Sequence, residues 1–245
     1  MSKSICFFLV AIVLVISNAL PAQTQDDEFT DGCKVDRSMV FIGPEPYTFA
    51  YVLTCYNFNA NHLPFKEEYK TATAFKLSGN FTEMSFDPRY DPHYVHLTYG
   101  DVTRVSVAAF KGFKNLVSIS IDSYAYHSDG VSLISVFDLT DAGVMTSVRE
   151  IDLSSNSISK IRGGTFKESF PMLEELDLSN NKLTRVNFKN LPDTLTHLDL
   201  SDNAVSTFVG RKALKSFSRL TYLNVAYNEG TFDVSRYERE QKTKN

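Results

Sequence analysis

The sequence lacks the long hydrophobic runs of a membrane protein, apart from a single run at its start. Lys3 precedes an uninterrupted apolar stretch from Ile5 to Ile16, and the small residues Ser17-Asn18-Ala19 follow it. This order is that of a secretory signal peptide. A membrane anchor is the alternative, but the stretch is shorter than the roughly 20 apolar residues that a spanning helix needs. We therefore expect residues 1–19 to be removed and the remainder to be secreted, with no membrane span.

Cysteine is scarce: the chain has three, and Cys6 would leave with the signal peptide. Cys33 and Cys55 remain, in an oxidising compartment where paired thiols usually form a disulfide. Neither lies in a C-x-x-C or a nucleophile motif, which disfavours the alternative of a redox or catalytic thiol. We predict a structural disulfide between them, worth about 3 kcal/mol in the loop-entropy model.

An excess of positive charge is also absent. The formal net charge is −4, and the loss of Lys3 with the signal peptide makes it −5. A mildly acidic chain is a poor match for nucleic acid or an anionic membrane. The sequence therefore predicts neither as a partner.

The common catalytic motifs are missing as well. The chain contains no G-x-x-x-x-G-K-[ST], no G-x-S-x-G and no H-E-x-x-H, which argues against a phosphate loop, a serine hydrolase and a zinc protease. His93 and His96 lie near Asp87 and Asp91, but no third ligand follows at a known metal-site spacing. We expect no catalytic residue, no metal site and no cofactor.

What the sequence does contain is one phrase repeated four times. The copies begin at Val148 (VREIDLSSNSI), Leu173 (LEELDLSNNKL), Leu195 (LTHLDLSDNAV) and Leu220 (LTYLNVAYNEG). Weaker copies begin at residues 50, 72, 94 and 116, so that eight starts follow one another at 22 to 25 residues, with one interval of 32 after residue 116. A period of this length is typical of solenoids, in which each repeat buries its apolar face against its neighbours.

The phrase, L-x-x-L-x-L followed three residues later by Asn, resembles that of the leucine-rich repeat family. The resemblance implies an α/β solenoid: a horseshoe with a parallel concave sheet of about eight repeats over residues 50–235, an N-terminal cap at 20–49 and a charged tail at 236–245. It also implies that Asn156, Asn181, Asn203 and Asn228 form a buried ladder. Within the family the chain is similar to short secreted invertebrate proteins such as the mosquito leucine-rich immune proteins.

Bulky apolar residues recur on the outer side of the repeats and predict core positions there. They are Phe113, Met145, Phe170 and Phe217, with Phe110, Phe166 and Leu214 as a second set. In the weak third repeat, the same register makes Tyr94, Leu97 and Tyr99 core residues.

The x positions of the phrase predict the solvent-facing side of the concave sheet, which is the default binding surface of such a fold. In the four strong repeats the candidate ligand-binding residues are Glu150, Asp152, Glu175, Asp177, His197, Asp199 and Tyr222. The column of Asp152, Asp177 and Asp199 has a scaffold alternative, because Asp or Asn is common at this position of the family's phrase. Upstream, the register predicts a more aromatic end of the same face, formed by Tyr51, Val52, Thr54 and Tyr56, then His96, Thr98 and Asp101.

Three segments fit the pattern poorly, and each keeps two interpretations. The long stretch 124–148 is either an enlarged outer segment packed on the core or a protruding loop that binds a partner. Asn80-Phe81-Thr82 is the only glycosylation sequon, yet the register places Asn80 on the buried ladder. After the last repeat no cysteine-rich cap follows. Either Phe232, Val234 and Tyr237 fold back over the open edge, or that edge pairs with another chain as a homo- or hetero-dimer.

Together these features favour a secreted recognition protein over an enzyme. We expect the concave face to bind another extracellular protein or a microbial surface component, in a role in innate immunity. The alternative is an adhesion or extracellular-matrix component that acts by self-association. The fold alone does not choose among ligands.

Overall fold

A computed structural model describes residues 33–42, 45–56, 58, 62–79, 84–99, 102–123 and 134–232. The predicted signal peptide and charged tail lie outside these ranges, as do the candidate glycosylation site Asn80, the candidate surface residue Asp101 and the candidate cap residues Val234 and Tyr237. Within the described ranges the chain forms four β-sheets joined by short helices and turns.

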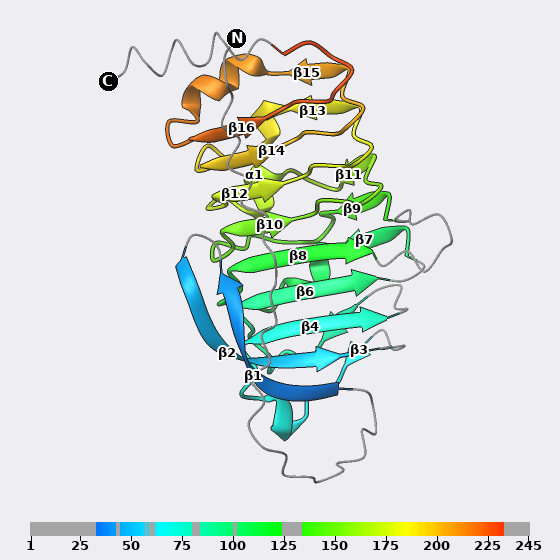
Figure 1. Ribbon diagram of the computed structural model, residues 1–245, viewed down its shortest axis with the longest axis vertical. Helices are drawn as coiled ribbons and strands as arrows, with labels where there is room; N and C mark the ends of the chain where they lie inside the picture. Colours follow the sequence, from blue (N-terminus) through cyan, green and yellow to red (C-terminus); the bar gives the residue numbers. More distant parts are fainter. Residues whose placement is uncertain are drawn as a thin grey trace.

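Strands from successive repeats form a nine-stranded sheet along the long axis of the molecule (Figure 1). In spatial order they are β1 (Cys33–Ile42), β2 (Glu45–Cys55), β4 (Ala74–Gly79), β6 (Tyr94–Tyr99), β8 (Ser118–Ser123), β10 (Glu150–Asp152), β12 (Glu175–Asp177), β14 (His197–Asp199) and β16 (Tyr222–Asn224). The strands from β2 to β16 are parallel, whereas β1 is antiparallel to β2. Each of the eight predicted repeats supplies one parallel strand, so the predicted α/β solenoid is confirmed.

Shorter strands form a second line along one side of this stack (Figure 1). One sheet contains β7 (Arg104–Ser106), β9 (Val136–Asp138) and β11 (Lys160–Arg162); the others pair β13 (Arg185–Asn187) with β15 (Thr207–Val209) and β3 (His62–Leu63) with β5 (Ser85–Phe86). Short helical segments then return the chain to the next repeat. These are η1 (Glu67–Tyr69), η2 (Val107–Phe110), α1 (Phe166–Ser169), η3 (Phe188–Asn190) and η4 (Arg211–Ser216).

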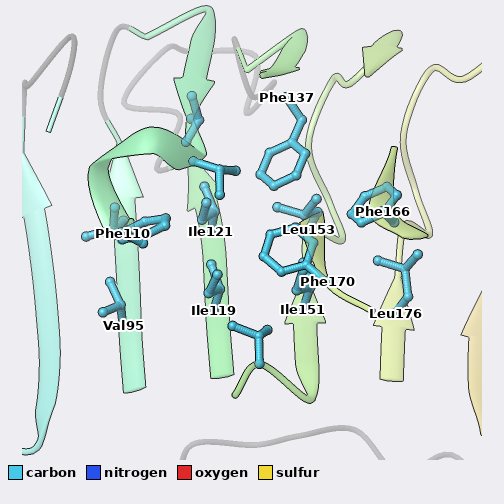
Figure 2. Close-up of a cluster of buried hydrophobic side chains, with 14 of the residues drawn as sticks. Val95, Phe110, Ile119, Ile121, Phe137, Ile151, Leu153, Phe166, Phe170 and Leu176 are labelled. Carbon is cyan, nitrogen blue, oxygen red and sulfur yellow. The ribbon is translucent and has the colours of Figure 1, made fainter. Parts of the chain in front are cut away.

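The core lies between the long sheet and the returning segments. Because side chains alternate along a strand, the middle residues of β10, β12 and β14 point inward, and Ile151, Leu176 and Leu198 are at most 2% exposed. Figure 2 shows such sheet residues together with phenylalanines contributed by the outer segments. All the predicted outer-side core residues are buried: Phe110, Phe113, Met145, Phe166, Phe170, Leu214 and Phe217. Each buried side chain contributes about 1.5–3 kcal/mol relative to exposure.

The predicted asparagine ladder joins each of these repeats to the one before it. Asn181 donates from Nδ2 to the carbonyls of Leu178 in its own repeat (3.2 Å) and Leu153 in the previous repeat (2.8 Å), and its Oδ1 accepts from the N–H of Ile158 (2.8 Å). Asn156, Asn203 and Asn228 make the corresponding Nδ2 bonds. The ladder therefore pairs buried backbone groups that the short strands leave over.

The residue before each ladder asparagine has a left-handed backbone. Ser155, Asn180, Asp202 and Tyr227 have φ between 52° and 58°. Short polar side chains tolerate this conformation best, because they can hydrogen-bond locally. Tyr227 is the exception in this set, and its side chain is 80% exposed.

The third repeat departs from the predicted register. Val95 and Leu97 point into the core and are at most 1% exposed, with Leu97 and Tyr99 buried as predicted. Tyr94, predicted to be a core residue, instead packs on the opposite side of the sheet against the small cluster that contains Ala74. The prediction was wrong because Tyr94 and Tyr99 have the spacing of the first and last leucines of the phrase. The true core positions of this repeat lie two residues earlier in the sequence, so that Val95 and Leu97 align with Ile119 and Ile121.

The N-terminal cap is an antiparallel hairpin formed by β1 and β2. Cys33 and Cys55 are directly opposite one another in this hairpin and form the predicted disulfide. The second strand, β2, begins at Glu45 and continues through Pro46 without a break. The predicted boundary between residues 49 and 50 therefore falls inside one strand. This hairpin closes the N-terminal end of the parallel sheet.

The two segments with open interpretations are described only in part. In the long stretch 124–148, β9 lies between β7 and β11, and Ile134, Phe137 and Leu139 are buried, which supports the packed interpretation for these residues. Near the C-terminus, the ring of Phe232 packs on those of Phe188 and Phe208, with centroids 5.6 Å and 5.1 Å apart. Phe232 thus folds back onto the last repeats.

Replacement of a ladder residue tests this account of the fold. Asn181→Ala removes the partners of three buried backbone groups, so we expect a loss of about 3 kcal/mol in the free energy of unfolding. Urea denaturation followed by circular dichroism measures it, with exposed Asn190→Ala as the control. A loss below about 0.5 kcal/mol for Asn181→Ala would show that the ladder does not stabilise the stack.

Candidate functional site

The predicted binding residues lie in two rows on the solvent-facing side of the long sheet, which we call the concave face. Their order follows from the strand register, in which paired residues of adjacent strands lie side by side. The Glu row contains Tyr94, Ser118, Glu150, Glu175, His197 and Tyr222. The Asp row contains His96, Ser120, Asp152, Asp177, Asp199 and Asn224. All seven candidate residues from the strong repeats are therefore on one surface.

The carboxylates of the Asp row have a structural role. The Oδ1 atoms of Asp152, Asp177 and Asp199 accept hydrogen bonds of 2.8–2.9 Å from the N–H groups of Ser154, Ser179 and Ser201, respectively. Each bond fixes the turn that leaves the strand, as side chains of Asp and Asn commonly do. The scaffold interpretation of this column thus has direct geometric support.

Asp199 is also tied to the last repeat. Its Oδ2 accepts from the hydroxyl of Tyr222 (3.0 Å) and from the Nδ2 of Asn224 (3.1 Å). The ring of Tyr222 stacks on that of His197, with centroids 5.8 Å apart. An aromatic platform therefore lies beside the carboxylates at this end of the concave face.

The Glu row contains the strongest electrostatic perturbation on this face. Glu150 and Glu175 are paired residues of adjacent parallel strands, where the backbones are about 4.8 Å apart. Burial, followed by the charge of Glu175, raises the pKa of Glu150 from 4.5 to about 7, against the opposing hydrogen bond with Ser118. Burial, followed by Glu150, raises the pKa of Tyr94 to about 12. Two half-buried carboxylates are thus adjacent in a row whose described members include no lysine or arginine.

The upstream end of the concave face differs from the prediction. Val52 shares a row with Ala74, Tyr94 and Glu150, and β2 alternates strictly. Tyr51, one residue before Val52, therefore points to the opposite side of β2 from the Glu row, and its predicted place on the concave face was wrong. Ala50, Val52 and Ala74 form a small buried cluster with Tyr94. At this end the continuation of the Glu row is therefore apolar and buried, whereas Thr54 and Lys76 continue the Asp row.

A polar group in the middle of the concave face contains the predicted residues His96 and Thr98 together with Asp122, which the sequence analysis missed. The Nε2 of His96 lies 3.3 Å from Asp122 Oδ2 and 3.1 Å from the hydroxyl of Thr98. Burial alone would raise the pKa of Asp122, but the hydrogen bonds and charges of His96, Thr98 and Lys76 outweigh it and lower the pKa. Asp122 was not selected because its repeat lacks the regular phrase.

The residues considered for a metal site are engaged separately. Asp87 pairs with Arg89, Asp91 accepts from the N–H groups of Lys114 and Asn115, and His93 lies edge-on to Tyr94. Across the residues that the structure describes, no three His, Cys, Asp or Glu side chains gather as a metal site requires. Nor does any helix in these ranges have both the length and the apolar character to cross a membrane.

Comparisons with known proteins agree with this architecture. The protein-family model described as Leucine rich repeat matches residues 146–205 of this chain, which contain β10, β12 and β14. Mimecan of Gallus gallus is 26% identical over 239 residues, covering 91% of this chain and 72% of that protein. Epiphycan of Homo sapiens is 35% identical over 91 residues, covering 37% of this chain and 26% of that protein. The match to epiphycan thus spans about a quarter of that relative's length.

One solved structure, "Crystal structure of TLR13-ssRNA13 complex", has a TM-score of 0.41 and 17% sequence identity, and the alignment covers 66% of this chain and 26% of that chain.

The stacked strands, the asparagine ladder and the open sheet face define a repeat scaffold of the kind that presents a binding surface. Together with the match over residues 146–205, they show that this chain has the leucine-rich repeat fold. The matched family is a repeat scaffold and not an enzyme family, which supports the prediction of a non-enzymatic protein.

The pKa of Glu150 predicts how stability depends on pH. Because the folded-state pKa is raised, the folded protein binds more protons than the unfolded chain between pH 4.5 and about 7, so stability falls as the pH rises through this window. Across this window we expect the free energy of unfolding of the wild type to fall by an amount on the order of 1–3 kcal/mol. Glutamine does not ionise, so Glu150→Gln should not show this fall. Urea denaturation at several pH values measures this, with the exposed Glu67→Gln as control. Equal pH dependence in Glu150→Gln and the wild type would contradict the assignment.

Proposed function

We propose that this protein is an extracellular recognition protein whose concave face binds a basic region of another extracellular protein. The disulfide between Cys33 and Cys55 supports an extracellular location, because such bonds persist in oxidising compartments. The sequence of residues 1–19 supports export. The binding role itself rests on the concave face.

The observation that carries this proposal is the adjacent pair Glu150 and Glu175, which forms no ion pair among the described residues. Placing like charges on adjacent strands is unfavourable, and the charge of Glu175 adds to burial in raising the pKa of Glu150. A lysine or arginine from a partner would supply the missing cation and recover part of this energy. The neighbouring rings of His197 and Tyr222 offer a face on which a guanidinium group can stack. The carboxylates of the Asp row already accept hydrogen bonds from the turns that follow their strands. We therefore assign contact with the partner mainly to the Glu row.

A second candidate function is self-association in the extracellular matrix through the last repeat. What favours it is the last strand, where Leu223 and Val225 are only partly buried whereas the equivalent Leu198 and Leu200 are fully buried. Tyr227 adds an exposed ring in a left-handed conformation that suits a bulky side chain poorly.

A microbial ligand and a role in innate immunity are a narrower form of the first proposal.

Affinity capture from the extracellular fluid of the source organism tests the proposal. We expect wild type to retain a partner that the Glu150→Lys, Glu175→Lys variant retains at least about tenfold less well, because two attractive contacts become repulsive. The matched control is Glu67→Lys, Glu68→Lys, which makes the same charge change on η1, away from the Glu row. Circular dichroism checks that all three proteins are folded.

Two outcomes would contradict the concave-face proposal. Equal retention of the same partner by both variants would place recognition on another surface. Sedimentation velocity distinguishes the second candidate, because self-association predicts a sedimentation coefficient that rises with protein concentration for the wild type. If assembly occurs and no other protein is retained, the self-association candidate replaces the first proposal.

A further inference from the structure

The short strands β7, β9, β11 and β13 lie along one side of the molecule (Figure 1). Exposed cations recur on three of these strands. The middle residue of each strand faces the core, so the flanking residues face solvent. The cations at these outward positions are Arg104 on β7, Lys160 and Arg162 on β11, and Arg185 on β13. We call these four residues the cationic strip. The net charge of −4 averages over this strip and the acidic concave face.

The strip is organised around a buried carboxylate. Asp138 occupies an outward position on β9, between β7 and β11, yet its side chain is 0% exposed. Its Oδ2 lies 2.5 Å from the Nη2 of Arg104 and 3.8 Å from the Nε of Arg162, and its Oδ1 accepts from the N–H of Thr140 (2.8 Å). Burial alone would raise the pKa of Asp138, but the Thr140 hydrogen bonds and the two arginines lower it. Asp138 therefore stays charged, in close contact with the guanidinium of Arg104 and within ion-pair distance of that of Arg162.

This arrangement leaves both arginine side chains partly accessible to a ligand. The side chains of Arg104 and Arg162 are 44% and 54% exposed. A guanidinium has five N–H donors in a fixed fork, more than one shared carboxylate oxygen can accept. Holding both groups in place beforehand reduces the entropy that a ligand must overcome on binding. Two oriented arginines across three strands are a suitable receptor for an oxyanion.

We propose that the cationic strip binds the sulfate groups of a linear sulfated polysaccharide, with Arg104 and Arg162 as the central clamp. Lys160 shares β11 with Arg162, and Arg185 occupies the corresponding first position of β13, so the cations extend along the stack. A chain with repeated sulfates would engage several of them at once. Because the strip lies on the short strands and the Glu row lies on the long sheet, both surfaces can be occupied together.

The surroundings favour a polysaccharide over the other polyanions. Single-stranded nucleic acid is usually held by aromatic rings that stack on its bases. A membrane surface is usually bound through exposed apolar side chains beside the cations. The large exposed apolar side chains of the described residues are Tyr51, Tyr56, Val144, Met172, Tyr222 and Tyr227, and none of them belongs to β7, β9, β11 or β13.

Isothermal titration with a heparin oligosaccharide of about ten sugar units tests the site in the full chain at physiological salt. We expect the Arg104→Gln, Arg162→Gln variant to bind at least about tenfold more weakly than wild type, because two charge-assisted contacts are lost. The matched control Lys70→Gln, Lys212→Gln removes two exposed cations elsewhere and should change affinity less than about twofold. A Glu150→Lys, Glu175→Lys variant should retain heparin binding, which separates this site from the concave-face proposal.

A substitution at Asp138 provides a second test, because net charge and the positioning of the arginines predict opposite changes in affinity. Asp138→Asn makes the strip more positive, so charge alone would strengthen binding, whereas loss of the clamp should weaken it at least about threefold. Since the arginine variant leaves a buried carboxylate unpaired, the triple variant Arg104→Gln, Asp138→Asn, Arg162→Gln removes the cluster without that defect. It should fold by circular dichroism and bind as weakly as the double variant. Stronger binding by Asp138→Asn would refute the positioning role.

Other probes identify the source of the anion. The same oligosaccharide without its sulfates should not bind, and inorganic phosphate or sulfate alone should compete only weakly. Single-stranded DNA and phosphatidylserine vesicles should bind at least about tenfold more weakly than heparin. Equal binding of the desulfated sugar, or tighter arginine-dependent binding of DNA or vesicles, would overturn the assignment to a sulfated polysaccharide.

Discussion

The structure depends on hydrogen bonds that no single repeat can make for itself. Strands of three residues leave backbone groups over at each turn, and the ladder asparagine of the next repeat pairs with them; Asn181, for example, bonds to Leu153 and Ile158. The same dependence applies to burial, because the inward face of each strand is covered by its neighbours. Stability is therefore a property of neighbouring repeats, and the ends of the stack need other solutions. The hairpin of β1 and β2 with its disulfide is the solution at the N-terminal end.

Stacking also fixes where function can reside. Every buried position is committed to contacts between repeats, so only the outward positions remain free to vary. On the long sheet these positions carry Glu150, Glu175, His197 and Tyr222, whereas on the short strands they carry the cationic strip. One scaffold thus presents surfaces of opposite charge on two sides, and the whole-chain net charge gives no sign of either.

The extent to which the sequence predicted the molecule follows from the regularity of its repeats. In the four strong repeats, the phrase placed the core, the ladder and the rows of the concave face residue by residue. In the third repeat, Tyr94 and Tyr99 have the spacing of the first and last leucines of the phrase but lie two residues too late, and a tyrosine ring is large enough to be taken for a core residue. The hairpin was missed because Pro46, within β2, is unfavourable in the interior of a strand. The cationic strip was missed because its strands are three residues long and far apart in sequence.

Two buried carboxylates show how the described surfaces differ. Asp138 has two arginines and the Thr140 N–H within its own fold, so its pKa is lowered and its charge is stable without a partner. Glu150 has a second carboxylate as its neighbour, and its pKa is raised to about 7. The same fold therefore places cations beside Asp138 and a second carboxylate beside Glu150. The negative charge of Glu150 can be neutralised by a proton or paired with a cation from a partner. At neutral pH, binding of that cation would therefore release the proton. Recognition on the concave face should thus weaken as the pH falls below about 7, since protonated Glu150 has no charge to pair.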